Sequence, residues 1–84
     1  MPTVLFKFGW RFYFVSFDCN EPPHIHVGDD KYKICKYWLR NNKGIFADNT
    51  GFTKQEIKKI EKVINENFEL LNTAFHEFCK GYKK

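Results

Sequence analysis

Residues 10–17 read Trp-Arg-Phe-Tyr-Phe-Val-Ser-Phe, and this run of aromatic and β-branched residues is the strongest strand signal in the chain. Side chains alternate between the two faces of a strand. Trp10, Phe12 and Phe14 share one face, and the other face, which begins with Arg11 and Tyr13, is also largely apolar. Two apolar faces predict a central strand of a sheet.

The neighbouring segments extend this strand into an antiparallel sheet. Residues 4–8 are apolar and β-prone, and Gly9 interrupts them, so a hairpin is predicted around Gly9. A short strand is predicted at 24–27, a fourth at 31–39 and a brief further one at 45–46. Lys36 interrupts the alternation of the fourth strand, which indicates a bulge or an edge position.

Residues 54–80 predict one long amphipathic helix. Thr53 suits the N-cap, Glu56 completes a capping box, and Gly81 is a natural stop. Apolar residues recur every three to four positions from Ile57 to Phe78. At about 1.5 Å per residue the helix would measure roughly 40 Å. The predicted fold is therefore α+β: a single domain (1–84) in which an antiparallel meander of about four strands (3–47) carries this helix on one face.

Size and charge limit the classes of function. The chain has 84 residues, of which 19% are aromatic, so a compact core is expected without disulfides or a structural metal. The net charge of +4 allows a nucleic acid or an acidic protein as partner and establishes neither. No apolar stretch approaches the ~20 residues of a membrane span.

Cysteine usage predicts the compartment. Cys19, Cys35 and Cys79 are odd in number, and the aromatic N-terminal segment does not resemble a secretory signal. We therefore expect free, mostly buried thiols and a cytoplasmic location.

The segment most suited to chemistry is Pro22-Pro23-His24-Ile25-His26-Val27, preceded by Asp18, Asn20 and Glu21. Histidines two positions apart on an extended segment point to the same side. The two prolines stiffen the approach, because each has a fixed φ and restricts the residue before it. The segment is therefore predicted to present two imidazoles beside carboxylates and an amide.

The chain resembles a known family. The resemblance rests on the opening Met-Pro-Thr, on Phe-Tyr-Phe-Val-Ser at 12–16, on the block at 20–27 and on the long C-terminal helix. These features are similar to the small bacterial proteins grouped as domain of unknown function 4160. The resemblance implies a short protein, often encoded beside another small protein, and candidacy as a toxin–antitoxin component.

The first functional hypothesis is an RNA-cleaving toxin that acts with a protein partner. His24 and His26 would serve as base and acid, since imidazole titrates near neutral pH. The phosphate would meet a basic side chain, for which the candidates are Arg11, Lys31 and Lys33. A carboxylate, Asp18 or Glu21, would orient an imidazole.

Two alternatives stay open. The His pair supplies two ligands for a divalent metal, with Asp18, Glu21, Cys19 or His76 as the third; no other cofactor is expected. A non-enzymatic module would instead bind a partner protein or a second copy through an uncovered sheet face or edge, with Pro22-Pro23-His24 as a rigid recognition loop. In the simplest case the histidines only form structural hydrogen bonds.

Overall fold

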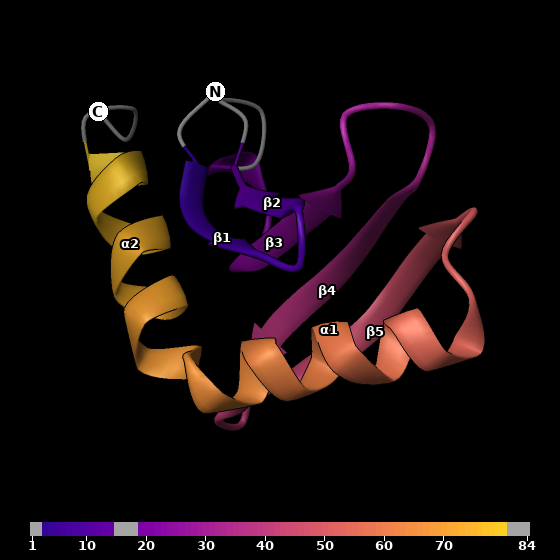
Figure 1. Cartoon of the computed structure of the whole chain (residues 1–84). Coiled ribbons are helices and arrows are strands. Elements are labelled where there is room, and N and C mark those ends of the chain that lie inside the picture. Colours follow the sequence, from indigo (N-terminus) through magenta and orange to yellow (C-terminus); the bar gives the residue numbers. More distant parts are fainter. Residues whose placement is uncertain (1–2, 15–18, 81–84) are drawn as a thin grey trace.

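The computed structural model describes residues 3–14 and 19–80 and has an α+β fold (Figure 1). One antiparallel sheet has the strand order β1-β2-β3-β4-β5. The strands are β1 (Thr3–Lys7), β2 (Trp10–Tyr13), β3 (His24–Gly28), β4 (Ile34–Arg40) and β5 (Lys43–Thr50), and the helices are α1 (Lys54–Glu66) and α2 (Phe68–Lys80). The predicted class and meander are confirmed, whereas the prediction of about four strands and one helix is wrong in detail.

The sheet gains a full fifth strand because the β4–β5 turn is tight. Asn41 and Asn42 both have left-handed φ values, of 56° and 62°. Such values suit a two-residue type I′ hairpin turn, which returns the chain directly into register. Arg40 and Lys43 are paired on either side of it. Residues 43–50 contain few β-branched residues, so the sequence pattern predicted only 45–46.

The bulge predicted near Lys36 is present, although the extra residue belongs to β5. Lys36 pairs with Asp48 and Tyr37 pairs with Phe46, which leaves Ala47 without a register partner. As predicted for the 10–17 segment, β2 has a neighbouring strand on each side, although β3 is the middle strand of the five. Within that segment β2 ends at Tyr13, and residues 15–18 lie outside the described part of the chain.

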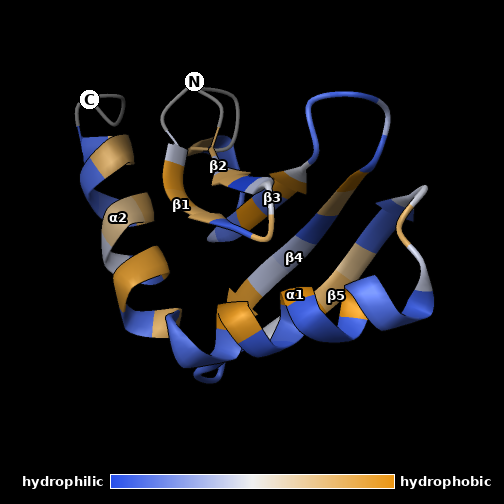
Figure 2. Cartoon of the chain, in the orientation of Figure 1, coloured by the Kyte–Doolittle hydropathy of each residue, from blue (hydrophilic) through white to orange (hydrophobic). Residues whose placement is uncertain are grey.

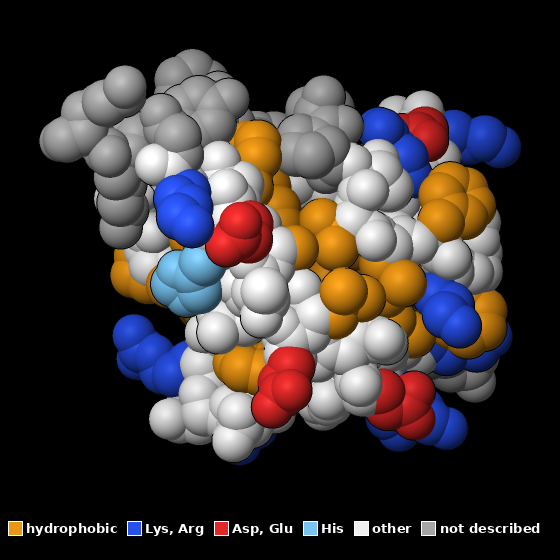
Figure 3. All heavy atoms as spheres, turned by 90° about the vertical axis from the view of Figure 1, so that its left-hand side faces the viewer, with side chains coloured by type: hydrophobic (Ala, Val, Ile, Leu, Met, Phe, Trp, Pro, Cys, Tyr) orange, Lys and Arg blue, Asp and Glu red, His pale blue; other side chains and the backbone are white. Residues whose placement is uncertain are grey.

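The core lies between the helices and one face of the sheet. That face contributes Phe12, Ile25, Val27, Cys35 and Tyr37, and the helices contribute Ile60, Val63, Ile64, Leu71 and Phe75. Figure 2 shows the same division: hydrophobic residues lie on the strands and inner helix surfaces, and the β3–β4 loop is hydrophilic. On the α2 side some hydrophobic side chains also reach the surface (Figure 3).

The α1 helix approaches β5 closely. A Cβ atom on Gly44 would lie 2.7 Å from Cγ2 of Ile64, so a larger residue there would force the packing between β5 and α1 to shift. The Gly44 N–H also donates to Oδ1 of Asn65, over 2.8 Å. The capping box at the start of α1 is confirmed, because Thr53 and Glu56 exchange both hydrogen bonds.

The predicted single helix is divided at Asn67, and α2 turns sharply away from α1 (Figure 1). Nδ2 of Asn67 donates to the carbonyl of Val63 over 2.8 Å, while its backbone N–H approaches the carbonyls of Val63 and Ile64. An asparagine side chain competes in this way with regular helical bonding. The apolar spacing continues through the break, which is why the pattern concealed it.

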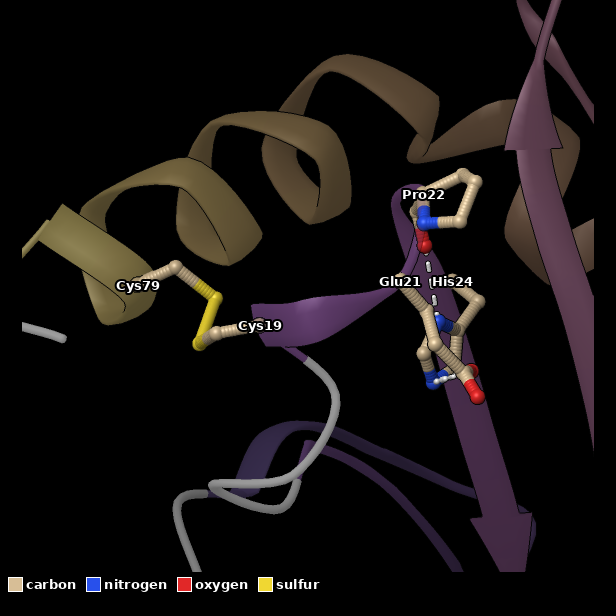
Figure 4. The surroundings of a disulfide bond; sticks show 5 residues. All are labelled: Cys19, Glu21, Pro22, His24 and Cys79. Atoms are coloured by element: carbon tan, nitrogen blue, oxygen red, sulfur yellow. Dashed lines mark hydrogen bonds and ion pairs between the residues drawn. A yellow bond between two sulfur atoms is a disulfide. The ribbon is translucent and has the colours of Figure 1, made fainter. Parts of the chain in front are cut away.

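A disulfide joins Cys19 to Cys79, so the expectation that all three cysteines are free is wrong (Figure 4). The bond ties the end of α2 to the segment that leads into β3. Cys35 is a free, buried thiol as predicted, and burial raises its pKa to about 12. None of the described helices is long and apolar enough to cross a membrane.

Candidate functional site

The strands carry their histidines and most of their charged side chains on the face of the sheet opposite α1, and we call it the open face. Cross-strand pairing assigns its members: Tyr13 pairs with His26, His26 with Lys36, His24 with Trp38, and Trp38 with Ile45. Paired residues of neighbouring strands share a face. The open face therefore comprises Phe6, Arg11, Tyr13, His24, His26, Lys36, Trp38, Arg40, Lys43, Ile45 and Asp48.

His24 is completely buried and is held from two sides (Figure 4). Its Nδ1 donates to the Pro22 carbonyl over 2.9 Å, and its Nε2 lies 3.7 Å from Oε1 of Glu21. The ring also packs against Trp38 and Phe75. An imidazole in this position fixes the Pro22-Pro23 loop rather than meeting a substrate.

His26 is the accessible imidazole of the pair. It is half-buried and stacks on the Tyr13 ring, with centroids 5.5 Å apart. The predicted common side of the two histidines is confirmed, because the ring centroids of His24 and His26 are 5.1 Å apart. Their exposure is unequal, so the face does not offer an accessible acid–base pair.

Carboxylates hold the basic groups nearest the histidines. Nζ of Lys36 lies 3.0 Å from Oε1 of Glu21 and 4.4 Å from the centre of the Trp38 ring. Arg11 forms an ion pair with Asp30 and lies over the Tyr13 ring. The positive charges of Lys36 and Arg11 are therefore largely compensated by carboxylates, and the cationic groups also pack on aromatic rings.

The structure separates the remaining predicted site residues from the His pair. Lys33 shares the helix side of the sheet with Cys35, and its hydrogen bond to Glu56 raises the pKa of the lysine. Lys31 is exposed in the β3–β4 loop. Asn20 is exposed next to Cys19, and Asp18 lies outside the described residues.

Sequence reasoning missed a small cavity on the open face. Pro22, Trp38, Arg40 and Ile45 line a cavity of about 150 Å³. Pro22 was predicted as part of a recognition loop, but the cavity itself was not predicted, because its walls come from three separate segments of the chain. Only the register of the β4–β5 hairpin brings Ile45 beside Trp38.

The described residues add no further ligand to the metal hypothesis. Within 3–14 and 19–80, no three His, Cys, Asp or Glu side chains are grouped to hold a metal ion. Cys19 is used in the disulfide. His76 lies on α2 and lines a different cavity, of about 340 Å³, beside that disulfide.

Comparison with known proteins identifies a family and no activity. A family model described as domain of unknown function (DUF4160) matches residues 9–76. The match includes the whole of β2 to β5, the Pro-Pro-His-Ile-His segment and most of α2. No curated protein and no solved structure matches the chain.

Proposed function

We propose, from the premise that the chain belongs to the DUF4160 family, that it is the binding member of a toxin–antitoxin-like pair and is not itself an enzyme. Its partner would be a small protein bound on the open face. The observation that carries this proposal is the cavity formed by Pro22, Trp38, Arg40 and Ile45.

The cavity suits one apolar side chain of a partner. Protein interfaces depend on a few anchor residues that fill well-packed pockets. At about 150 Å³ the cavity is of the size of a leucine or phenylalanine side chain. Its walls are rigid, because His24 holds Pro22 and the Glu21–Lys36 ion pair covers Trp38. A preorganised pocket loses little freedom on binding.

The surroundings favour protein over RNA as the partner. Phe6 is 61% exposed and Ile34 is 41% exposed at the β1 and β4 positions of the same side. Of the basic residues here, Arg11 and Lys36 form ion pairs with Asp30 and Glu21, and Asp48 pairs across the strands with Lys36. A phosphate backbone needs uncompensated positive charge, whereas mixed charge around apolar groups is typical of protein interfaces.

RNA cleavage is the weaker proposal, because it now depends on His26 alone. The buried His24 is assigned to positioning, with Glu21 as its neighbour. Neither a metal nor another cofactor takes part in the proposed binding. A second copy of the chain is the competing occupant of the open face.

The test measures both growth and binding. We would express the protein alone, the product of the adjacent gene alone, and both together, and record the growth of each strain. Copurification and affinity would then be measured for the two products. Arg40→Glu should weaken binding by about tenfold or more, because it reverses a charge at the cavity rim. The matched control is Lys62→Glu on the exposed side of α1, which should bind as the wild type does.

Three results would contradict the proposal. One is equal affinity of the Arg40→Glu and Lys62→Glu variants for the adjacent gene product. Another is a homodimer that Arg40→Glu dissociates while the adjacent product does not bind. The third is RNA cleavage that is lost in His26→Ala and kept in Arg40→Glu.

We propose the cytoplasm as the location, although Cys19 and Cys79 are joined in a disulfide. The expectation combined free thiols with an N-terminal segment unlike a secretory signal. The Cys19–Cys79 disulfide removes the first of these, because disulfides persist mainly in oxidising compartments. Cell fractionation, with free thiols blocked at lysis, tests both the location of the protein and the oxidation state of Cys19 and Cys79. Recovery from the cytoplasmic fraction supports the proposal, and recovery of the disulfide form from a periplasmic or secreted fraction contradicts it.

A further inference from the structure

We infer that a second surface, between β5 and α1, binds a short acidic segment of a partner protein that carries one bulky apolar side chain. The groove has a volume of about 420 Å³ and lies on the opposite side of the sheet from the open face. Its apolar lining consists of Phe46, Phe52 and Ile57, and Lys54 and Lys58 stand along its α1 wall. This inference does not depend on the proposed function.

The apolar part of the groove is unusually open. The Phe46 side chain is 51% exposed although its ring packs edge-on against the buried Tyr37 ring, with centroids 5.7 Å apart. Ile57 is half-buried beside it. A large apolar side chain bound here would bury the Phe46 and Ile57 side chains, and the binding free energy would gain about 25 cal/mol for each Å² of apolar surface removed from water.

The edge of β5 limits how a segment can lie there. The Gly44 N–H points away from β4, because it donates to Asn65 of α1. In an antiparallel strand the N–H and C=O groups of residues two positions apart point in the same direction. The backbone N–H and C=O groups of Phe46 therefore also point away from β4. At the far end the Asn49 N–H is occupied by its neighbour Asp48. The edge thus allows short pairing around Phe46, and the side chains must supply most of the affinity.

The charge of the groove selects an acidic occupant. Lys54 and Lys58 are exposed, lie one turn apart on α1, and form no ion pair with any other described residue. The acid that lines the groove, Glu61, accepts a hydrogen bond from the Tyr37 hydroxyl over 2.9 Å. Carboxylates flanking an apolar residue would therefore meet two available ammonium groups.

The test uses a synthetic peptide, acetyl-Gly-Asp-Glu-Phe-Glu-Asp-Gly-amide, titrated into ¹⁵N-labelled protein at low salt. We expect saturable amide shifts centred on Phe46, Ile57 and Lys58. The Lys54→Glu/Lys58→Glu variant should bind about tenfold or more weakly, and Lys62→Glu should change affinity less than about twofold. Replacing the peptide phenylalanine by serine should abolish saturation.

The open-face variant separates this inference from the proposed function. Arg40→Glu should leave peptide affinity unchanged, and thermal unfolding of every variant shows whether the fold is retained. Equal binding by the double variant, equal binding of a Lys/Arg version of the peptide, or shifts confined to the open face would overturn the inference. The absence of amide shifts at millimolar peptide would also overturn the inference. So would shifts in the groove that decanoate causes and the peptide does not, because they would indicate a small amphiphile as the ligand.

Discussion

Replacing both Cys19 and Cys79 by serine should lower the free energy of unfolding by about 4 kcal/mol. The bond joins residues separated by 60 positions, so it closes most of the chain into one loop. The loop-entropy relation gives about 14 cal/mol/K for a loop of about this length, or about 4.3 kcal/mol at 25 °C. Small domains have a total stability of roughly 5–15 kcal/mol, so the variant should be folded but marginal.

The fold should survive because α2 has other contacts with the sheet. The Phe75 and Phe78 rings pack on Phe14 with centroids 5.2 Å and 5.9 Å away. Leu71 is completely buried in the same core. We therefore expect retained helix content together with faster hydrogen exchange at the end of α2.

Urea unfolding with and without reductant measures the effect. For a slope of about 1–2 kcal/mol/M the midpoint should fall by roughly 2–4 M. Cys35→Ala is the matched control: reductant should still destabilise this variant and should have no effect on the double serine variant. A difference below about 1 kcal/mol would contradict the predicted destabilisation, and three reactive thiols in air-purified protein under denaturing conditions would contradict the disulfide itself.

Three further perturbations test the packing, a turn and the buried ionisable groups. Gly44→Ala should destabilise the protein by about 1–3 kcal/mol in urea unfolding, because the added Cβ would lie 2.7 Å from Ile64; a neutral effect would contradict the close α1–β5 packing. Asn42→Gly should stabilise by about 0.5–1 kcal/mol, because glycine adopts the observed φ of 62° without strain; a loss of stability would argue against the type I′ turn. Burial raises the pKa of Cys35 to about 12. The pKa of Tyr37 is also raised, mainly by burial and secondly by its hydrogen bond to Glu61. The unfolded thiol and phenol ionise near pH 8.5 and 10, so stability should fall above about pH 9, by up to about 1.4 kcal/mol per pH unit and group. Cys35→Ala should move the onset to about pH 10, and stability that stays constant to about pH 11 would contradict both assignments.

Local sequence signals predicted much of the fold because they act over a few residues. The Thr53–Glu56 capping box and the aromatic alternation at 10–14 depend only on neighbouring positions, and both are found as predicted. The strand at 24–27 is present with one additional residue. The common side of His24 and His26 follows from the period of a strand, so the pattern predicted that these two side chains lie together.

Contacts between distant segments decided the rest. Burial of His24 requires α2 to bring Phe75 against it, and that in turn requires the bend at Asn67, across which the apolar period is continuous. The pairing of Cys19 with Cys79 depends on the same bend, because the last turn of α2 must reach the segment before β3. Spacing along the chain carries no information about such approaches.

Local patterns were therefore enough to predict the α+β class, the start of the helical region and the segment in which the histidines lie. Packing between distant segments makes one imidazole a buried support and leaves the other accessible. It also placed Lys33 on the helix side and assembled the Trp38 cavity and the Phe46 groove. The physical reason is that exposure and pocket shape are properties of packed surfaces, which exist only once separate strands and helices meet.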